Sequence, residues 1–219
     1  QELCSDQIGK LATLALMIAS LRIVISRRMY SNIHVKSGGR SMIKHTTTIR
    51  RLETVDWEAF RGVRLEALLC EPASFTSAYS DWSALPDNDW RQRLNSPVFA
   101  IFQDITPVGL LGLVREKLPR ASHRASITMV YLRKDFRGSG LAKSLLDMVA
   151  KFAWDIGVTQ LELTVSVENP VAISFYRREG FVETGRIPAG FIHEGREIDD
   201  VLMVRRLAIQ PLGTKSRRA

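Results

Sequence analysis

The strongest constraint on the fold is a strand, a glycine-rich loop, a helix and a second strand that follow one another between residues 126 and 167. The segment 126–132, SITMVYL, predicts the first strand, and 160–167, QLELTVSV, predicts the second by alternating apolar and polar residues. Between them, apolar residues recur at helical spacing at Leu141, Leu145, Met148, Val149 and Phe152, and Gly157 stands where a helix would end. Such a crossover makes the two strands parallel and the connection right-handed.

The rest of the chain alternates strands and helices and contains no repeat or low-complexity tract. The expected elements are a strand over 46–53, a helix capped by Asp56 and ending before Pro72, a short helix over 86–94, strands over 98–103 and 108–116, a helix from Pro170, and a last strand over 199–207. The strands 98–103, 108–116 and 126–132 should form an antiparallel meander. The pattern predicts one mixed α/β layer structure.

The positive charge of the chain lies at its two ends. Residues 1–45 hold seven Lys or Arg and two acids, residues 208–219 hold three Lys or Arg and no acid, and the remainder is neutral. Basic tails at the ends of a chain are usually solvated, and the neutral centre offers no basic surface for nucleic acid. Nucleic-acid binding through the basic ends is therefore the weakest of the functional hypotheses.

Cysteine and histidine spacing indicates neither a disulfide framework nor a metal site. The two cysteines, Cys4 and Cys70, lie far apart, and the four histidines show no spacing typical of metal ligands. We expect no metal, and we expect a reducing, cytoplasmic location.

The apolar segment 11–25 is interrupted by Arg22 after eleven uncharged residues, which is short of the roughly 20 that span a bilayer. It also lacks the small-residue cleavage site of a signal peptide, so we expect no membrane association. Met42 lies just before the first predicted strand and follows the linker-like KSGGRS. We expect residues 1–41 to be an extension outside the fold, either translated upstream sequence or a cloning remnant. The folded domain should then be 42–207, with 208–219 as a basic tail.

The loop RKDFRGSGLA, residues 133–142, has the composition of a phosphate site. The first turn of a helix leaves N–H groups unpaired and is partially positive, and a glycine-rich entry lets these amides approach a phosphate. Arg137 adds a full charge there. The loop matches neither GxxxxGK[ST] nor GxGxxG, and taken alone it could be an ordinary connection.

The residues that follow favour a more specific interpretation. Asn169 and Pro170 come at the end of the second parallel strand, and Tyr176 precedes Glu179-Gly180-Phe181. With the loop, this pattern resembles the GNAT superfamily of acyl-CoA-dependent N-acyltransferases, and the order of elements agrees from about residue 46 to 207. Lys134 stands where many relatives have proline, which removes some rigidity. The segments SFTSAYSDW and IPAGFIHEG carry no recognisable subfamily signature.

The resemblance implies a mixed, mostly antiparallel central sheet with a splayed parallel strand pair and flanking helices. It also implies that the pantetheine arm of acetyl-CoA pairs with the backbone of Val130, Tyr131 and Leu132, and that Asn169 contacts the pantetheine region. The diphosphate would lie on the amides of the loop, which comprises Arg137, Gly138, Ser139, Gly140, Leu141 and Ala142.

The implied reaction is direct attack by an amine on the acetyl-CoA thioester, with Tyr176 as the general acid for the leaving sulfur. A helical tyrosine is otherwise most often a packing residue. Glu116, Glu162 and Glu168 are candidates for the base, but exposed, solvated acids are the better explanation of all three, and we assign none. Glu194, Asp199 and Asp200 could favour a cationic acceptor, but a solvated strand edge is the better explanation of these acids.

We therefore expect an acetyl-CoA-dependent N-acetyltransferase that acts on a primary amine of a small molecule or a peptide, with a homodimer allowed. The alternative is a non-catalytic acyl-CoA-binding regulatory module, which would keep the loop without turnover.

Overall fold

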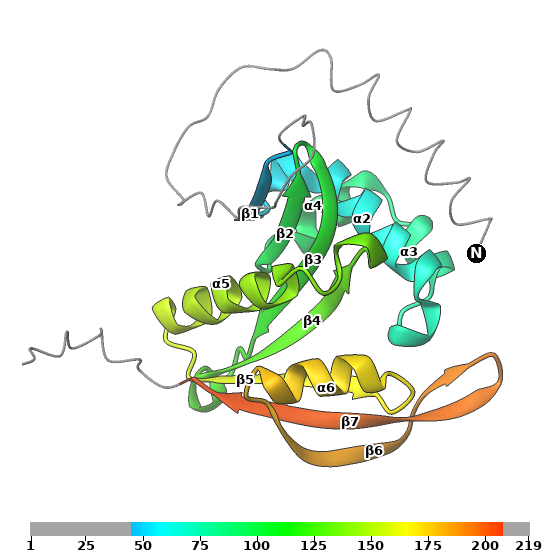
Figure 1. Ribbon diagram of the computed structural model, residues 1–219, viewed down its shortest axis with the longest axis vertical. Coiled ribbons are helices and arrows are strands. Elements are labelled where there is room, and N and C mark those ends of the chain that lie inside the picture. The colour runs from blue at the N-terminus through cyan, green and yellow to red at the C-terminus, as the bar shows by residue number, and fades with distance from the viewer. Residues whose placement is uncertain (1–44, 208–219) are drawn as a thin grey trace, which may run out of the picture. The chain divides into compact units, whose positions relative to one another are not determined.

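The computed structural model describes residues 45–207, and Figure 1 shows its helices and strands. The predicted extension and the basic tail lie outside the described residues. Within the described range, seven strands form one sheet in the order β1-β2-β3-β4-β5-β7-β6. The β4–β5 pair is parallel, with Arg124–Ser126 facing Gln160–Glu162, whereas β1–β2, β2–β3, β5–β7 and β6–β7 are antiparallel. The predicted mixed, mostly antiparallel sheet is confirmed.

The chain forms two compact units. Of the described residues, one unit contains 45–113 together with Thr128–Leu146, and the other contains Val114–Ile127 and 147–207. Strand β4 (Arg124–Leu132) and helix α5 (Leu141–Asp155) each contribute to both units.

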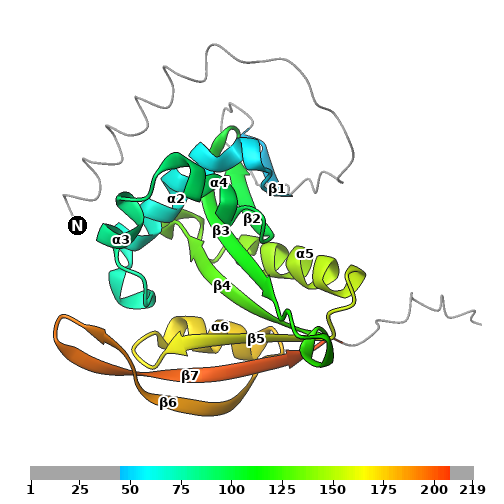
Figure 2. The same cartoon turned by 180° about the vertical axis from the view of Figure 1, so that it is seen from behind.

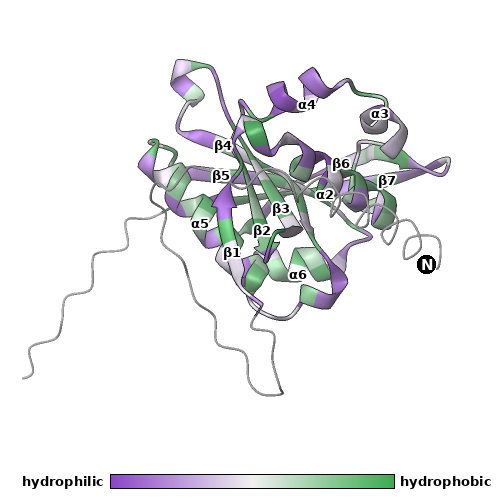
Figure 3. Cartoon of the chain, turned by 90° about the horizontal axis from the view of Figure 1, so that it is seen from above, coloured by the Kyte–Doolittle hydropathy of each residue, from purple (hydrophilic) through white to green (hydrophobic). Residues whose placement is uncertain are grey.

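Helices and three strands make up most of the first unit, and Figure 2 shows α2 and α4 beside β2 and β3. The strands are β1 (Thr47–Arg51), β2 (Val98–Gln103) and β3 (Thr106–Arg115), and the α-helices are α2 (Trp57–Cys70), α3 (Tyr79–Ser83) and α4 (Asp87–Arg93). The hydrophobic colouring of β2 and β3 in Figure 3 agrees with their burial. Short 3-10 turns cover Thr54–Asp56, Pro72–Ser74 and Lys134–Phe136.

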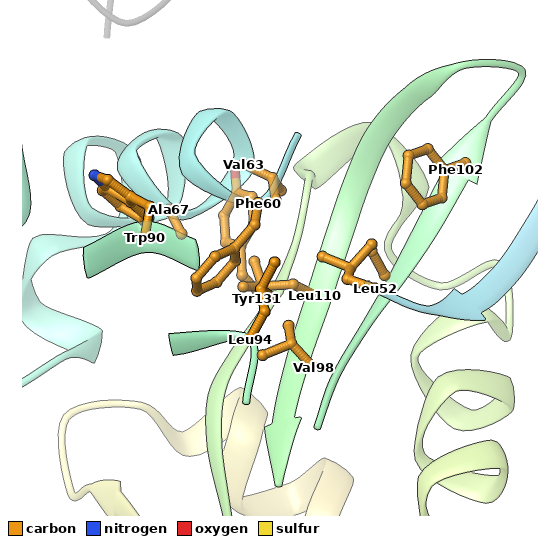
Figure 4. Packing of buried hydrophobic residues seen from close by; sticks show 11 residues of the cluster. Leu52, Phe60, Val63, Ala67, Trp90, Leu94, Val98, Phe102, Leu110 and Tyr131 are labelled. Carbon is orange, nitrogen blue, oxygen red and sulfur yellow. The ribbon is translucent and has the colours of Figure 1, made fainter. Parts of the chain in front are cut away.

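The core of the first unit lies between α2, α4 and the strands (Figure 4). Phe60 and Trp90 are fully buried and meet edge to face, with ring centroids 5.4 Å apart. Arg64 is also buried, with its guanidinium 4.6 Å from the ring of Phe75 and 4.5 Å from that of Trp82. Burial, and secondarily the charge of Arg93, lower the pKa of Arg64 to about 10. Stacking on aromatic faces partly offsets the desolvation of this cation.

The second unit holds β5 (Gln160–Ser166), α6 (Pro170–Arg178), β6 (Val182–His193) and β7 (Arg196–Arg206). Figures 1 and 2 both show α6 alongside β5 and β7. Strand β7 lies between β5 and β6, and its pairing with β6 shifts register between Ile187 and Phe191. A short 3-10 turn, Pro119–Ala121, precedes β4.

Most predicted elements are present within a few residues of their expected bounds, and three details differ. The sequence reasoning missed α3 and the whole of β6. Asp56 does precede α2, but its carboxylate makes no capping bond to that helix. Instead it accepts the amide hydrogen of Glu53 at 2.8 Å and pairs with Arg50 at 2.7 Å.

A buried carboxylate joins α2 to the end of β4. Glu66 is 8% exposed and accepts two hydrogen bonds from Arg133, from Nε and Nη2, both at 2.6 Å. It also accepts a hydrogen bond from the Tyr131 hydroxyl at 3.0 Å. Burial, and then the charge of Glu66, raise the pKa of Tyr131, whereas the hydrogen bond to Glu66 raises the pKa of Arg133. Both partners therefore stay protonated, and the cluster fixes the chain where the glycine loop begins.

Replacing Glu66 with glutamine should lower the free energy of unfolding by about 3 kcal/mol, because it leaves a half-buried Arg133 without its counter-charge. Urea denaturation measures the change. Glu58→Gln, at an exposed position of the same helix, is the matched control and should cost less than about 1 kcal/mol. Equal losses in the two variants would show that the Glu66 cluster does not hold the fold together.

Candidate functional site

The glycine loop lies in the first unit between β4 and α5. Gly138 and Gly140 have positive φ angles of 75° and 85°, and both are exposed. A Cβ atom added to either would meet nothing within 4 Å, so the backbone angles, not crowding, require glycine here. Open space over the loop is what the approach of a ligand needs.

Helix α5 begins at Leu141, directly after this loop, and no acidic residue lies in its first turn. The first amides of a helix have no acceptor within it, and the helix dipole makes this end partially positive. The Leu141 and Ala142 amides therefore lie at the partially positive end of α5. Phosphate binding by these amides stays a prediction.

Arg137 does not present a free charge over the loop. Its Nε donates to the carbonyl of Leu132 at 2.9 Å, and its Nη2 donates to Glu71 Oε1 at 2.8 Å. Ser139 donates its hydroxyl hydrogen to the carbonyl of Phe136. Arg137 therefore adds its charge to the loop together with the counter-charge of Glu71, and these side chains brace the loop.

The predicted pantetheine strand Val130–Leu132 directly precedes this loop in the first unit. The side chains of Tyr131 and Leu132 are buried, and the Leu132 carbonyl already accepts the hydrogen bond from Arg137 Nε. The pairing of this segment with pantetheine stays a prediction. Met129, just before this segment, has a positive φ of 55° in the middle of the strand. Such strain in a non-glycine residue often marks functional segments, and no sequence pattern indicated it.

Asn169 and Tyr176 lie in the second unit, at the start and within α6. Asn169 is the N-cap of α6, and its Oδ1 accepts the Ala172 amide hydrogen at 3.0 Å. Tyr176 is 6% exposed, with its ring 5.4 Å from Phe175 and 5.6 Å from Phe181. Burial raises the pKa of the Tyr176 hydroxyl, so it is protonated at neutral pH, as an ordinary tyrosine also is.

The three carboxylates considered as bases are poorly suited to that role. Glu116 is exposed, Glu162 is bound by Arg124, and Glu168 pairs with Arg196 at 2.9 Å. Asp200, by contrast, is 8% exposed, so its interpretation as part of a solvated edge is wrong. The sequence reasoning did not distinguish it from its neighbour Asp199.

Within residues 45–207, no group of three or more His, Cys, Asp and Glu side chains is arranged to hold a metal ion. No helix in the same range has both the length and the apolar character needed to cross a bilayer.

Comparison with known proteins identifies the family. A family model described as the acetyltransferase (GNAT) family matches residues 62–181. The chain is 28% identical over 167 residues to the L-amino acid N-acetyltransferase AaaT of Escherichia coli, covering 72% of this chain and 96% of that one. It is 31% identical over 91 residues to spermidine N(1)-acetyltransferase of Vibrio cholerae, covering 41% of this chain. That match spans only 53% of the Vibrio protein.

Solved structures share the fold. An acetyltransferase of the GNAT family from Streptococcus pneumoniae has a TM-score of 0.64 at 24% identity, covering 74% of this chain and 99% of that one. The yncA protein of Salmonella typhimurium, solved with acetyl-CoA, has a TM-score of 0.65 at 18% identity, covering 78% and 99%. At these identities the structures show the fold alone. Because the family model matches more than half of its residues, the chain belongs to the GNAT family of acetyltransferases.

Proposed function

We propose that the chain transfers the acetyl group of acetyl-CoA to a primary amine, by direct attack of the amine nitrogen on the thioester carbon. The observation that carries this proposal is the glycine loop, where two positive-φ glycines open onto the acid-free start of α5. Membership of the GNAT family supports the same donor.

The proposal assigns each part of the donor to a segment of the chain. The backbone amides of Arg137–Ala142 would hold the diphosphate, and the backbone of Val130–Leu132 would pair with the pantetheine arm. Asn169 would contact the same arm through its amide group, while its Oδ1 caps α6. Bound in this way, acetyl-CoA supplies the activated acyl carbon.

Tyr176 is proposed as the acid that protonates the departing sulfur. As the nitrogen–carbon bond forms and the carbon–sulfur bond breaks, the sulfur gains a pair of electrons and needs a proton. The Tyr176 hydroxyl is protonated at neutral pH, as a proton donor must be, although burial raises its pKa and makes it a weaker acid than an exposed tyrosine. What supports the role is its place on α6 in the family pattern. The ring contacts with Phe175 and Phe181 restrict the orientation of the hydroxyl.

We propose a small-molecule amine as the acceptor, with a peptide amine as the less supported choice. The names of two relatives, which act on spermidine and on L-amino acids, support the first. A measurement of thiol release from acetyl-CoA with amino acids, polyamines, aminoglycosides and N-terminal peptides tests both. The cytoplasmic location and the homodimer stay predictions.

Replacing Gly140 with valine should raise the Michaelis constant for acetyl-CoA about tenfold or more, because a branched side chain at φ 85° strains the loop that holds the phosphates. Initial rates of thiol release at varied acetyl-CoA measure it. Gly195→Val is the matched control, since Gly195 has φ 75° and equally open space but lies in the turn between β6 and β7. A rise of the same size in both variants, or in neither, would contradict the loop assignment.

Replacing Tyr176 with phenylalanine should lower kcat about a hundredfold with little change in CoA affinity, because the ring packing remains and only the acidic hydroxyl is lost. Stopped-flow thiol release and calorimetric CoA binding separate the two effects. Tyr79→Phe, at an exposed tyrosine, should leave both unchanged. If the unsubstituted protein binds CoA tightly yet releases no thiol with any acceptor, the non-catalytic module is the better description.

A further inference from the structure

Asp200 is a buried carboxylate with no partner. It lies on β7 opposite Ser166 of β5 and Ile187 of β6, and its exposed fraction is 8%. Among residues 45–207, no hydrogen bond or ion pair reaches its side chain. Its carboxylate oxygens are not fully sealed from solvent, so a ligand group can reach them.

The partner strand is irregular where it passes this carboxylate. The β6–β7 register shifts between Ile187 and Phe191, and Ala189 in that stretch has a positive φ of 50°. A Cβ atom on Gly190 would stand 2.8 Å from Asp200 Oδ2, so only glycine fits there without movement. Bulges of this kind commonly re-aim side chains beside active sites.

Other acids of the second unit have partners that Asp200 lacks. Glu162 is bound by Arg124, Glu168 by Arg196, and Glu183 by Arg177 and Arg186. The adjacent Asp199 accepts the Ala189 amide hydrogen at 3.0 Å. A buried charge without a partner is costly, and burial raises the pKa of Asp200. A cationic group brought by a ligand would supply the missing counter-charge.

Among the described residues, no cationic side chain lies opposite Asp200 on the neighbouring strands. The side chains that share its face on the neighbouring strands are Ser166 and Ile187, and neither titrates near neutral pH. Ser166 Oγ already accepts the Glu168 amide hydrogen at 3.1 Å. Further along β5 the same face holds Glu162, which Arg124 neutralises. By strand alternation, Asp199 and Arg186 belong to the opposite face.

We propose that Asp200 binds the amino group of the acceptor and takes a proton from it, an inference that rests on the proposed function. A primary amine arrives mostly as an ammonium ion, which an unpaired carboxylate attracts. One N–H proton passes to a carboxylate oxygen, and the nitrogen lone pair then forms the bond to the acyl carbon while the carbon–sulfur bond breaks and the sulfur takes the Tyr176 proton. The nitrogen then loses a second N–H proton, which restores the Tyr176 hydroxyl through solvent, and leaves the neutral amide. The protonated Asp200 returns its proton to water. The acceptor class is thus a cationic primary amine.

The test compares Asp200→Asn with Asp199→Asn in thiol-release kinetics across pH. Asp200→Asn should lower kcat/KM for the acceptor about a hundredfold or more, abolish the acidic limb of the pH profile, and leave CoA affinity unchanged. Asp199→Asn is the matched control, because an asparagine oxygen can still accept the Ala189 amide hydrogen. A full-rate Asp200→Asn enzyme with an unaltered pH profile would overturn the inference while leaving the proposed function intact.

A second measurement separates this role from a structural one. Since the pKa of Asp200 is raised in the folded state, its ionisation opposes folding above its unfolded-state pKa, and the penalty vanishes below that value. Asp200→Asn should therefore be more stable than the parent at pH 7 and no more stable near pH 3. Lost stability at pH 7 with retained activity would make Asp200 a structural residue. If the parent shows no turnover with any amine, the proposed function and the role of Asp200 both fail.

Discussion

The hydrogen bonds of Glu66 to Tyr131 and Arg133 hold the segment from which the glycine loop of the first unit begins. The glycine loop is exposed and two of its residues have positive φ, so the loop cannot order itself by packing. Two ion pairs hold the ends of the 3-10 turn Lys134–Phe136 that leads into the loop. Before the turn Arg133 binds Glu66 of α2, and after it Arg137 binds Glu71 at the end of α2. Lys134 does not fix its backbone φ as a proline would, and the ion pairs on either side of the turn restrain the loop instead.

Elements with strong local periodicity were predictable. The hairpin β2–β3 and the crossover β4–α5–β5 follow from alternation, helical spacing and turn residues, so they were placed within a few residues. Strand β6 was not, because Gly185, Pro188 and Gly190 interrupt its alternation and two register shifts move its side chains between faces. Its pairing with β7 sustains it, and such long-range pairing leaves no local pattern.

The position of the glycine loop before α5 was predictable from the sequence, whereas the partners of the charged side chains at the candidate site were not. Glycines before an amphipathic helix are compatible with an anion site but alone could be an ordinary connection, and it was the family resemblance that pointed to a diphosphate. The partner of Arg137, however, is 66 positions away in the sequence, so its pairing could not be inferred. Asp199 and Asp200 are adjacent and chemically identical, and only the strand register assigns one to a backbone hydrogen bond and the other to burial without a partner.

Glu66 and Asp200 together show why burial alone does not give a carboxylate its role. Both are 8% exposed, so both lose most of their hydration on folding. Three hydrogen bonds from Arg133 and Tyr131 replace the lost hydration of the Glu66 carboxylate, so its charge helps to hold the fold together. No described residue replaces the hydration that the Asp200 carboxylate loses, so its negative charge opposes folding until a ligand brings a positive charge to it. A protein keeps such a residue at a cost in stability, and activity that needs the charge is the usual reason.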